Sequence, residues 1–188
     1  IGFKSTRRGG RVVLNGSLFH IDYSDQQFST ISSEPPFRIA VTIPEASIDG
    51  FELEGTILVS EYLTMGLGLG LLDAEIKGGM RSPDTSNFTG NLFVDYSKPM
   101  GNGRDFVMRA DYRNQGNRYL EQNEQFWVPS STYIDLRLGV EGDNWSLIAW
   151  SRNITDERAA TGGAFLAHGV IRIMNRPRSN GVTFTYKF

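Results

Sequence analysis

The residue types that most often carry chemistry are scarce in this chain. Its 188 residues hold two His and no Cys, which excludes a cysteine nucleophile, a cysteine zinc site and a disulfide scaffold. Neither His20 nor His168 has the i, i+4 partner or the clustered carboxylates that a metal site needs. His20 and Asp22 share one face of a strand, but no GxSxG nucleophile turn accompanies them. A Ser-His-Asp hydrolase is therefore arithmetically possible but poorly supported.

The remaining candidate motifs have simple structural readings. Gly66-Leu67-Gly68 begins like a phosphate-binding loop, but the third glycine is misplaced and no helix follows. The sequence predicts no enzyme, no metal site and no cofactor. Four carboxylates in or beside long predicted loops are expected to be solvated: Asp84, Glu121, Glu124 and Asp156.

Composition points to a protein made of many strands. With 19 basic and 21 acidic residues the formal net charge is −2, so no basic field favours nucleic acid as a partner. The 21 glycines exceed the average share of about 7%, and aromatic residues reach 12%. The longest nearly apolar stretch, 65–72, is far shorter than the roughly 20 residues of a membrane-spanning helix.

Alternation with a period of two runs through most of the chain. In 63–71, Met65 and four leucines fall on one face, and Thr64 and three glycines fall on the other. Five segments behave in this way, and their apolar faces carry no charged residue while the opposite faces carry seven. These segments are 63–71, 88–96, 106–113, 133–140 and 182–188.

Weaker strand patterns complete an all-β, antiparallel up-and-down meander of about nine strands in one domain. They cover 1–5, 11–23, 48–60 and 144–153, and one strand could run through 104–119. Short connections are predicted at 6–10, 60–62, 97–103 and 141–143. Long connections alternate with them near 29–37, 77–85, 115–131 and 155–180.

The charged face suits a water-filled lumen, which would put lipid against the apolar face. Two girdles of aromatic residues at the strand ends favour this interpretation, and so does the length of 104–119. His20 and Asp22 are interpreted as a polar lumen pair. The expected lumen-facing residues are Arg109, Asp111, Arg113, Asp135 and Arg137. The expected girdle residues are Tyr62, Tyr96, Tyr112 and Trp145, joined in the longer set by Phe88, Tyr119 and Phe188.

Four motifs in sequence resemble the C-terminal part of a TonB-dependent outer-membrane receptor. The run from Gly2-Phe3-Lys4-Ser5 to Asp22-Tyr23-Ser24-Asp25-Gln26 resembles that family's "GxKs…n.a.F..dY.d.Q". Residues 48–54 resemble "a.i.GvElE", and Trp145 with 151–157 resembles "W…v.Nl.De". Pro177-Arg178 and 181–188 resemble the closing "pR.yg.t..y.F". The resemblance covers essentially the whole chain.

This resemblance implies a transmembrane barrel of 22 strands, of which residues 1–188 would form about strands 14 to 22. The family's N-terminal plug and its energy-coupling segment match nothing here, which favours a fragment. The short turns would face the periplasm and the long loops the outside. Phe184, Tyr186 and Phe188 resemble the terminal signal that the barrel-assembly machinery reads by strand addition.

The implied function is energy-coupled uptake of a scarce nutrient across the bacterial outer membrane. Iron–siderophore complexes, vitamin B12 and oligosaccharides are the family's usual small-molecule cargo. The implied partners are outer-membrane lipid, the barrel-assembly machinery and an energising inner-membrane protein that acts through the plug. Two alternatives stay open: a passive, self-contained outer-membrane barrel or porin, and a soluble lipocalin-like ligand-binding barrel.

Overall fold

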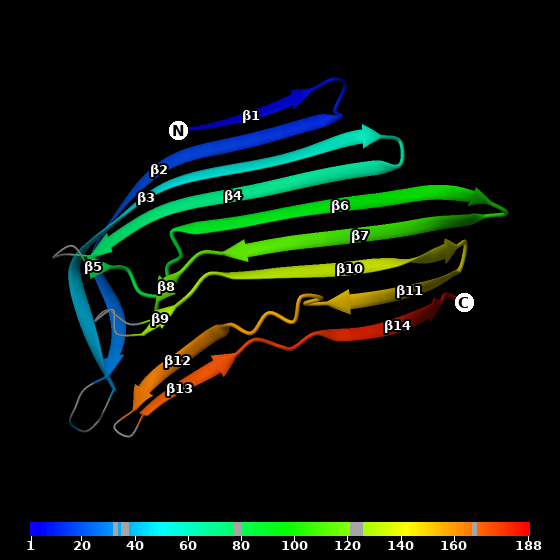
Figure 1. Ribbon diagram of the computed structural model, residues 1–188. Coiled ribbons are helices and arrows are strands. Elements are labelled where there is room, and N and C mark those ends of the chain that lie inside the picture. Colours follow the sequence, from blue (N-terminus) through cyan, green and yellow to red (C-terminus); the bar gives the residue numbers. More distant parts are fainter. Residues whose placement is uncertain (32–33, 35–37, 77–79, 121–125, 167–168) are drawn as a thin grey trace.

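A computed structural model describes most of the chain, and its regular elements are all strands (Figure 1). Described are residues 1–31, 34, 38–76, 80–120, 126–166 and 169–188. Within these ranges no helix is long and apolar enough to cross a membrane. The strands are β1 (Gly2–Arg7), β2 (Val12–Ile31), β3 (Arg38–Ser60), β4 (Leu63–Ile76), β5 (Met80–Arg81), β6 (Phe88–Gly101), β7 (Arg104–Gln115), β8 (Arg118–Tyr119), β9 (Trp127–Val128), β10 (Ser131–Gly142), β11 (Trp145–Arg152), β12 (Ala160–Leu166), β13 (Gly169–Met174) and β14 (Ser179–Tyr186).

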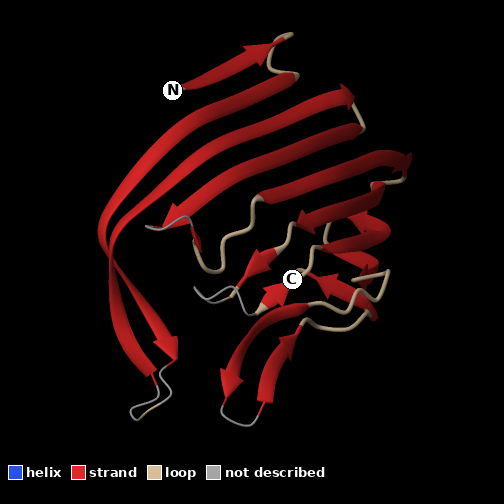
Figure 2. Ribbon diagram, turned by 60° about the vertical axis from the view of Figure 1, so that its left-hand side comes forward, coloured by secondary structure: helices blue, strands red, loops and turns tan. Residues whose placement is uncertain are grey.

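Nine of these strands form one antiparallel path in the order β1-β2-β3-β4-β6-β7-β10-β11-β14, and β5 pairs with β4. Neighbours in the sheet follow one another along the chain, so the predicted all-β meander of nine strands is confirmed. The sheet is curved and open, with β1 at one edge and β14 at the other (Figures 1 and 2). It has the form of a segment of a barrel wall.

Tight turns join the strands at one end of the sheet, as predicted, but β6 runs to Gly101, so the connection expected at 97–103 is shorter than predicted. In the turn between β6 and β7, Gly101, Asn102 and Gly103 all have positive φ, a conformation that glycine and asparagine adopt at little cost. The other end carries small additional elements. β8 pairs with β9, and β12 pairs with β13, each as a separate two-stranded sheet.

The predicted strand ends were wrong at this second end. β2 continues to Ile31 and β3 already begins at Arg38, so both outlast the predicted segments 11–23 and 48–60. The single strand expected over 104–119 ends at Gln115. Gln115 is the last β7 residue with partners on both sides, Thr89 and Ser131. The Gly116 N–H still donates to the carbonyl of Phe88, the first residue of β6, at 2.7 Å, and the chain then leaves the sheet.

The apolar face of the sheet is not packed into a dry interior. Leu67 is 41% exposed and Leu138 is 42% exposed, although both lie in the middle of strands. The described residues contain few buried apolar side chains. These are Ala46, Ala74, Ile76, Phe126, Val128 and Ala159.

Candidate lumen wall and external loops

An arginine–aspartate network occupies the polar face of β6, β7 and β10. Asp95, Arg109 and Arg137 lie directly opposite one another on these three strands. Asp111 and Asp135 lie opposite each other on the same face, two residues along the strands from Arg109 and Arg137. Arg109 donates to Asp95 Oδ2 at 3.1 Å and to Asp111 Oδ1 at 2.9 Å. Its guanidinium is thus held by two carboxylates from two strands.

The network continues toward β11. Arg113 donates to Asp135 Oδ2 at 2.9 Å, and the other oxygen of Asp135 accepts the Asn153 backbone N–H at 2.8 Å. Arg137 is exposed and forms no ion pair with any side chain of the described ranges. The five residues predicted to face the lumen therefore share one face, and four of them are ion-paired.

Phe93 adds an aromatic ring to this polar face. The Arg109 guanidinium carbon lies 4.7 Å from the centre of the Phe93 ring, within the range of a cation–π contact. The same ring covers Gly66 on β4, where a Cβ atom would overlap it. Gly66 is one of the glycines that alternate with leucines in 63–71. Its missing side chain leaves the space that the Phe93 ring occupies.

The opposite face is continuously apolar across neighbouring strands. Leu67, Leu92, Tyr112 and Ile134 lie opposite one another on β4, β6, β7 and β10. A second row continues the surface toward the edge strand β14. It contains Tyr96, Met108, Leu138, Ala149 and Val182. Side chains of the two faces alternate along every one of these strands, as the period of two predicted.

Three of the predicted girdle residues lie on this apolar face. Tyr96 makes an edge contact with Phe106, with ring centres 6.2 Å apart. Tyr112 lies in the row described above, and Trp145 is opposite Tyr186. Tyr62 instead lies in the turn between β3 and β4. Tyr119, which was expected to extend the girdle, lies in the β8–β9 hairpin rather than in the main sheet.

The C-terminal strand β14 presents aromatic side chains at the sheet edge. Phe184 is opposite Leu147 on β11 and is 64% exposed. The rings of Tyr186 and Phe188 meet edge-on with centres 5.2 Å apart. The Tyr186 hydroxyl accepts a hydrogen bond from Asn144 at 3.1 Å. No strand of the described residues pairs with the outer edge of β14, and aromatic side chains alternate along it.

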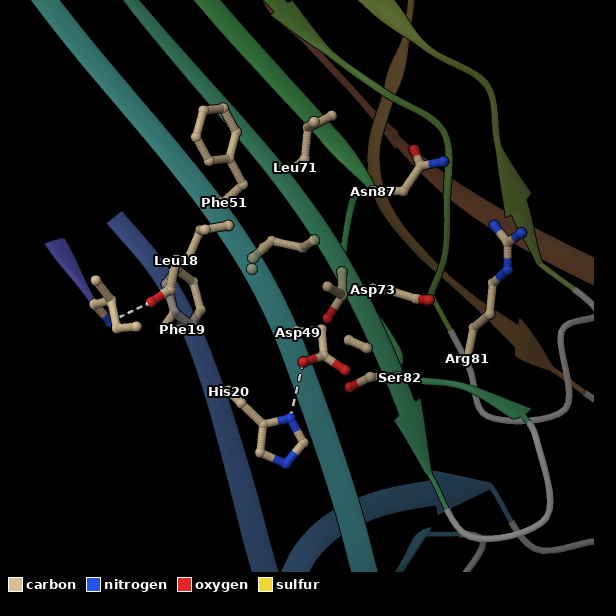
Figure 3. A pocket seen from close by; sticks show the side chains of 15 residues that line it. Leu18, Phe19, His20, Asp49, Phe51, Leu71, Asp73, Arg81, Ser82 and Asn87 are labelled. Carbon is tan, nitrogen blue, oxygen red and sulfur yellow. Dashed lines mark hydrogen bonds and ion pairs between the residues drawn. The ribbon is translucent and has the colours of Figure 1, made fainter. Parts of the chain in front are cut away.

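His20 and Asp22 were wrongly expected on the polar face. Leu18, Phe51 and Leu71 lie opposite one another on β2, β3 and β4, on the apolar face. Two residues further along each strand, on the same face, His20, Asp49 and Asp73 form the next row. These residues line a groove of about 1020 Å³ (Figure 3). On this face, the apolar side chains therefore end at the row of Leu18, Phe51 and Leu71, and polar side chains follow in the next row.

The His20 ring lies between two carboxylates beyond this apolar row. Its Nδ1 is 2.8 Å from Asp49 Oδ1, and its Nε2 is 3.0 Å from Asp22 Oδ1. The described side chains contain no group of three or more His, Cys, Asp or Glu that could hold a metal ion.

A hydrogen-bonded turn follows β11 and carries the motif Asn153-Ile154-Thr155-Asp156. Asn153 and Asp156 both have positive φ, near 50°. The Asn153 side chain is buried, donates to the Glu157 and Arg176 carbonyls, and accepts the Glu157 N–H at 2.9 Å. The Arg178 backbone N–H donates to Asp156 at 2.8 Å. The turn therefore ties the end of β11 to the segment that enters β14.

Asp156 is not simply solvated, contrary to the prediction. The hydrogen bond from the Arg178 backbone lowers the pKa of Asp156, and the Arg158 side chain adds to this effect. Asp84 is also paired, with Arg118 at 2.7 Å. His168, Glu121 and Glu124 lie outside the described residues.

Arg118 is a residue that no sequence pattern marked. Its side chain is only 6% exposed, and it connects Asp84 with the Thr161 carbonyl, 43 residues further along the chain. A single arginine beside a predicted loop resembles any solvated cation. Only the contacts between distant loops distinguish it.

Comparison with known proteins gives this geometry a family. The family model for the β-barrel of TonB-dependent receptor-like proteins matches residues 1–154. Among solved structures, the ferric yersiniabactin uptake receptor FyuA from Yersinia pestis is 16% identical over the whole chain, with a TM-score of 0.86. The siderophore receptor PiuA from Acinetobacter baumannii is 18% identical over the whole chain, with a TM-score of 0.76.

A third similar structure is the ferripyoverdine receptor of the outer membrane of Pseudomonas aeruginosa, 16% identical over the whole chain with a TM-score of 0.75. The chain spans 29%, 28% and 26% of the lengths of these three proteins. At these identities the structures show the shared fold. The family model covers most of the chain, and it is therefore the match that assigns the sequence: the chain belongs to the β-barrel family of TonB-dependent receptors, which are transport receptors of the outer membrane.

Proposed function

We propose that this chain forms about strands 14 to 22 of the 22-stranded barrel of a TonB-dependent receptor for energy-coupled uptake of a scarce nutrient. The observation that carries the proposal is the partition of the register-aligned strands into one ion-paired polar face and one apolar, exposed face. Lipid tolerates apolar side chains but not unpaired charges, so the polar face belongs to the lumen.

An iron–siderophore complex is the cargo class that the comparisons favour over vitamin B12 and oligosaccharides. The similar structures include receptors described for ferric yersiniabactin, ferripyoverdine and a ferric catecholate. The chain covers less than a third of each of these receptors. The proposal therefore includes a longer protein, in which a plug and a segment that reaches the energising inner-membrane partner accompany this chain.

Uptake by the full-length receptor tests this function. Cells that express it as their sole such receptor are given radiolabelled ferric yersiniabactin, ferripyoverdine, a ferric catecholate, vitamin B12 or a maltodextrin. We expect uptake of one ferric siderophore, and its loss when an uncoupler removes the proton gradient. Uptake that survives the uncoupler would instead identify a passive barrel.

We also propose that Phe184, Tyr186 and Phe188 form the signal for the barrel-assembly machinery. They alternate along β14 and the two residues that follow it, and no strand of the described residues pairs with the outer edge of β14. Replacing Phe188 with Ala should lower the amount of receptor inserted in the outer membrane. Lys187→Ala, one residue away on the opposite face, is the control and should leave insertion unchanged.

A further inference from the structure

Among the described residues, the two most deeply buried side chains, Val128 and Phe126, lie in an external connection and not in the main sheet. Val128 is 0% exposed, Phe126 is 2% exposed and Arg118 is 6% exposed. All three belong to the connection between β7 and β10, which contains the β8–β9 hairpin. This connection therefore has a small packed core of its own.

Arg118 joins this core to two other connections. Its Nε donates to Asp84 Oδ1 at 2.7 Å, and Asp84 lies between β5 and β6. Its terminal nitrogen donates to the carbonyl of Thr161 on β12 at 3.4 Å. The Asp84 backbone N–H donates to the Tyr119 carbonyl at 2.6 Å, which fixes the same two connections a second time. A buried guanidinium with these partners is satisfied only while all three connections are in place.

Phe126 supplies a second, independent link to the β12–β13 hairpin. It packs against Gly163, where a Cβ atom would overlap its ring. The Arg172 guanidinium of β13 lies 5.7 Å from the ring centre. On the opposite side of the β8–β9 hairpin, Tyr119 and Trp127 are cross-strand partners with ring centres 4.9 Å apart, and Trp127 is 42% exposed. The packed core thus supports an exposed aromatic surface.

We propose that Arg118 is a positioning residue that holds these three external connections together as one preassembled surface for cargo. This inference rests on the proposed uptake function. When the connections are already ordered before the cargo binds, binding does not have to order them. The affinity is then higher, because no conformational entropy of the connections is lost on binding. Loss of Arg118 should therefore weaken cargo binding while leaving the barrel and the later transport steps intact.

The first measurement is uptake kinetics with Arg118→Ala and Gly163→Val in the full-length receptor. The probes are ferric yersiniabactin, ferric preacinetobactin, ferripyoverdine and a ferric catecholate. For the probe that the wild type takes up, we expect the half-saturating concentration to rise about tenfold in both variants, equivalent to about 1.4 kcal/mol. The maximal rate should be unchanged. Arg118→Lys should recover part of the loss because it retains the charge facing Asp84.

The matched control is Arg104→Ala, which removes an exposed arginine at the opposite end of β7. It should leave the half-saturating concentration at the wild-type value. Heat-dependent gel migration shows whether each variant has formed its barrel. A half-saturating concentration that stays at the wild-type value in both Arg118→Ala and Gly163→Val would overturn the proposal.

The second measurement needs no cargo. Hydrogen exchange is followed in peptides that contain Asp84, Arg118 and Thr161, in the full-length wild type and in both variants. We expect each substitution to accelerate exchange in all three connections. Acceleration confined to the substituted connection would show that the three connections are not held together as one surface. If the wild type takes up none of these ferric probes, the assignment of a siderophore cargo fails, and the exchange data still decide whether the three connections are held together.

Discussion

At the scale of single residues, the turn after β11 shows how side chains replace missing main-chain partners. Asn153 satisfies the carbonyls of Glu157 and Arg176, and Asp156 accepts the Arg178 N–H. Both residues have the left-handed backbone conformation that Asn and Asp tolerate best after glycine. The N-x-x-D spacing that resembles the family motif is therefore explained by the geometry of the turn at the base of the β12–β13 hairpin.

The ionisation of Asp156 should control the order of this turn. Its pKa lies below the ordinary value of 3.8, so its stabilising contribution is complete above that value and is lost as the pH falls through the lower, folded pKa. In Asp156→Asn, hydrogen exchange at Arg178 should exceed the wild-type rate at neutral pH. After correction for intrinsic exchange rates, the difference should vanish in acid below the folded pKa.

Glu157→Gln serves as the control for that experiment, because the Glu157 carboxylate forms no hydrogen bond or ion pair with described residues. It should exchange like the wild type at every pH. A pH-independent difference between Asp156→Asn and the wild type would show that the carboxylate charge does not order the turn.

The polar face offers a comparison between two arginines of the same row. Arg109 is held by two carboxylates, and its side chain is 38% exposed, whereas Arg137 has no ion pair within the described ranges. Arg109→Ala leaves Asp95 and Asp111 without their shared partner and should lower the free energy of unfolding by about 1–2 kcal/mol. Arg137→Ala should change it by less than about 0.5 kcal/mol.

Denaturant titration of the full-length receptor in lipid bilayers measures both free energies. Equal losses for the two variants would mean that the ion pairs of Arg109 contribute nothing beyond the packing of an arginine side chain. The double variant Arg109→Ala with Asp111→Ala then isolates the coupling energy of that pair.

At the scale of the strands, the environment of each face is the property with the largest energetic consequence. Leu138 lies on the apolar face in the middle of β10. An arginine placed there in contact with hydrocarbon should cost about 2–4 kcal/mol. Unfolding of Leu138→Arg in lipid bilayers measures this cost. A cost below about 0.5 kcal/mol would contradict the assignment of lipid to this face.

Thr64→Arg is the matched control. Thr64 lies opposite Asp95 on the polar face, in the row that contains Arg137, beside Leu138. The same arginine is introduced there into water and next to a carboxylate, so we expect a change of less than about 1 kcal/mol. Comparison of the two sites separates the effect of lipid from the intrinsic cost of an arginine in a strand.

At the scale of the whole molecule, the sheet formed by the described residues has two unpaired edges, β1 and β14. Unpaired edges and an exposed apolar face both favour association with other chains. The 188-residue chain expressed alone should therefore aggregate in buffer and become dispersed in detergent. Size-exclusion chromatography with and without detergent measures this. A monomer that stays soluble in detergent-free buffer would favour the soluble barrel instead.

The sequence by itself determined the strand class, the alternation of faces and the short turns. In 63–71 each face has a uniform character, so the period of two is sufficient to separate Leu67 from Gly66. The family resemblance was likewise carried by short local motifs, and the family model confirms it over residues 1–154. These properties are local, because side-chain direction in a strand follows from the backbone geometry of successive residues.

Only the tertiary structure decided the features that depend on neighbours distant in the sequence. Residues 11–23 have apolar side chains on both faces, so the face of His20 follows from its pairing with Asp49. The end of β7 at Gln115 follows from where β6 and β10 begin. The burial of Arg118 follows from loops that meet across 34 and 43 residues. Strand pairing and loop packing are long-range contacts, and no local pattern encodes which distant groups will satisfy a given side chain.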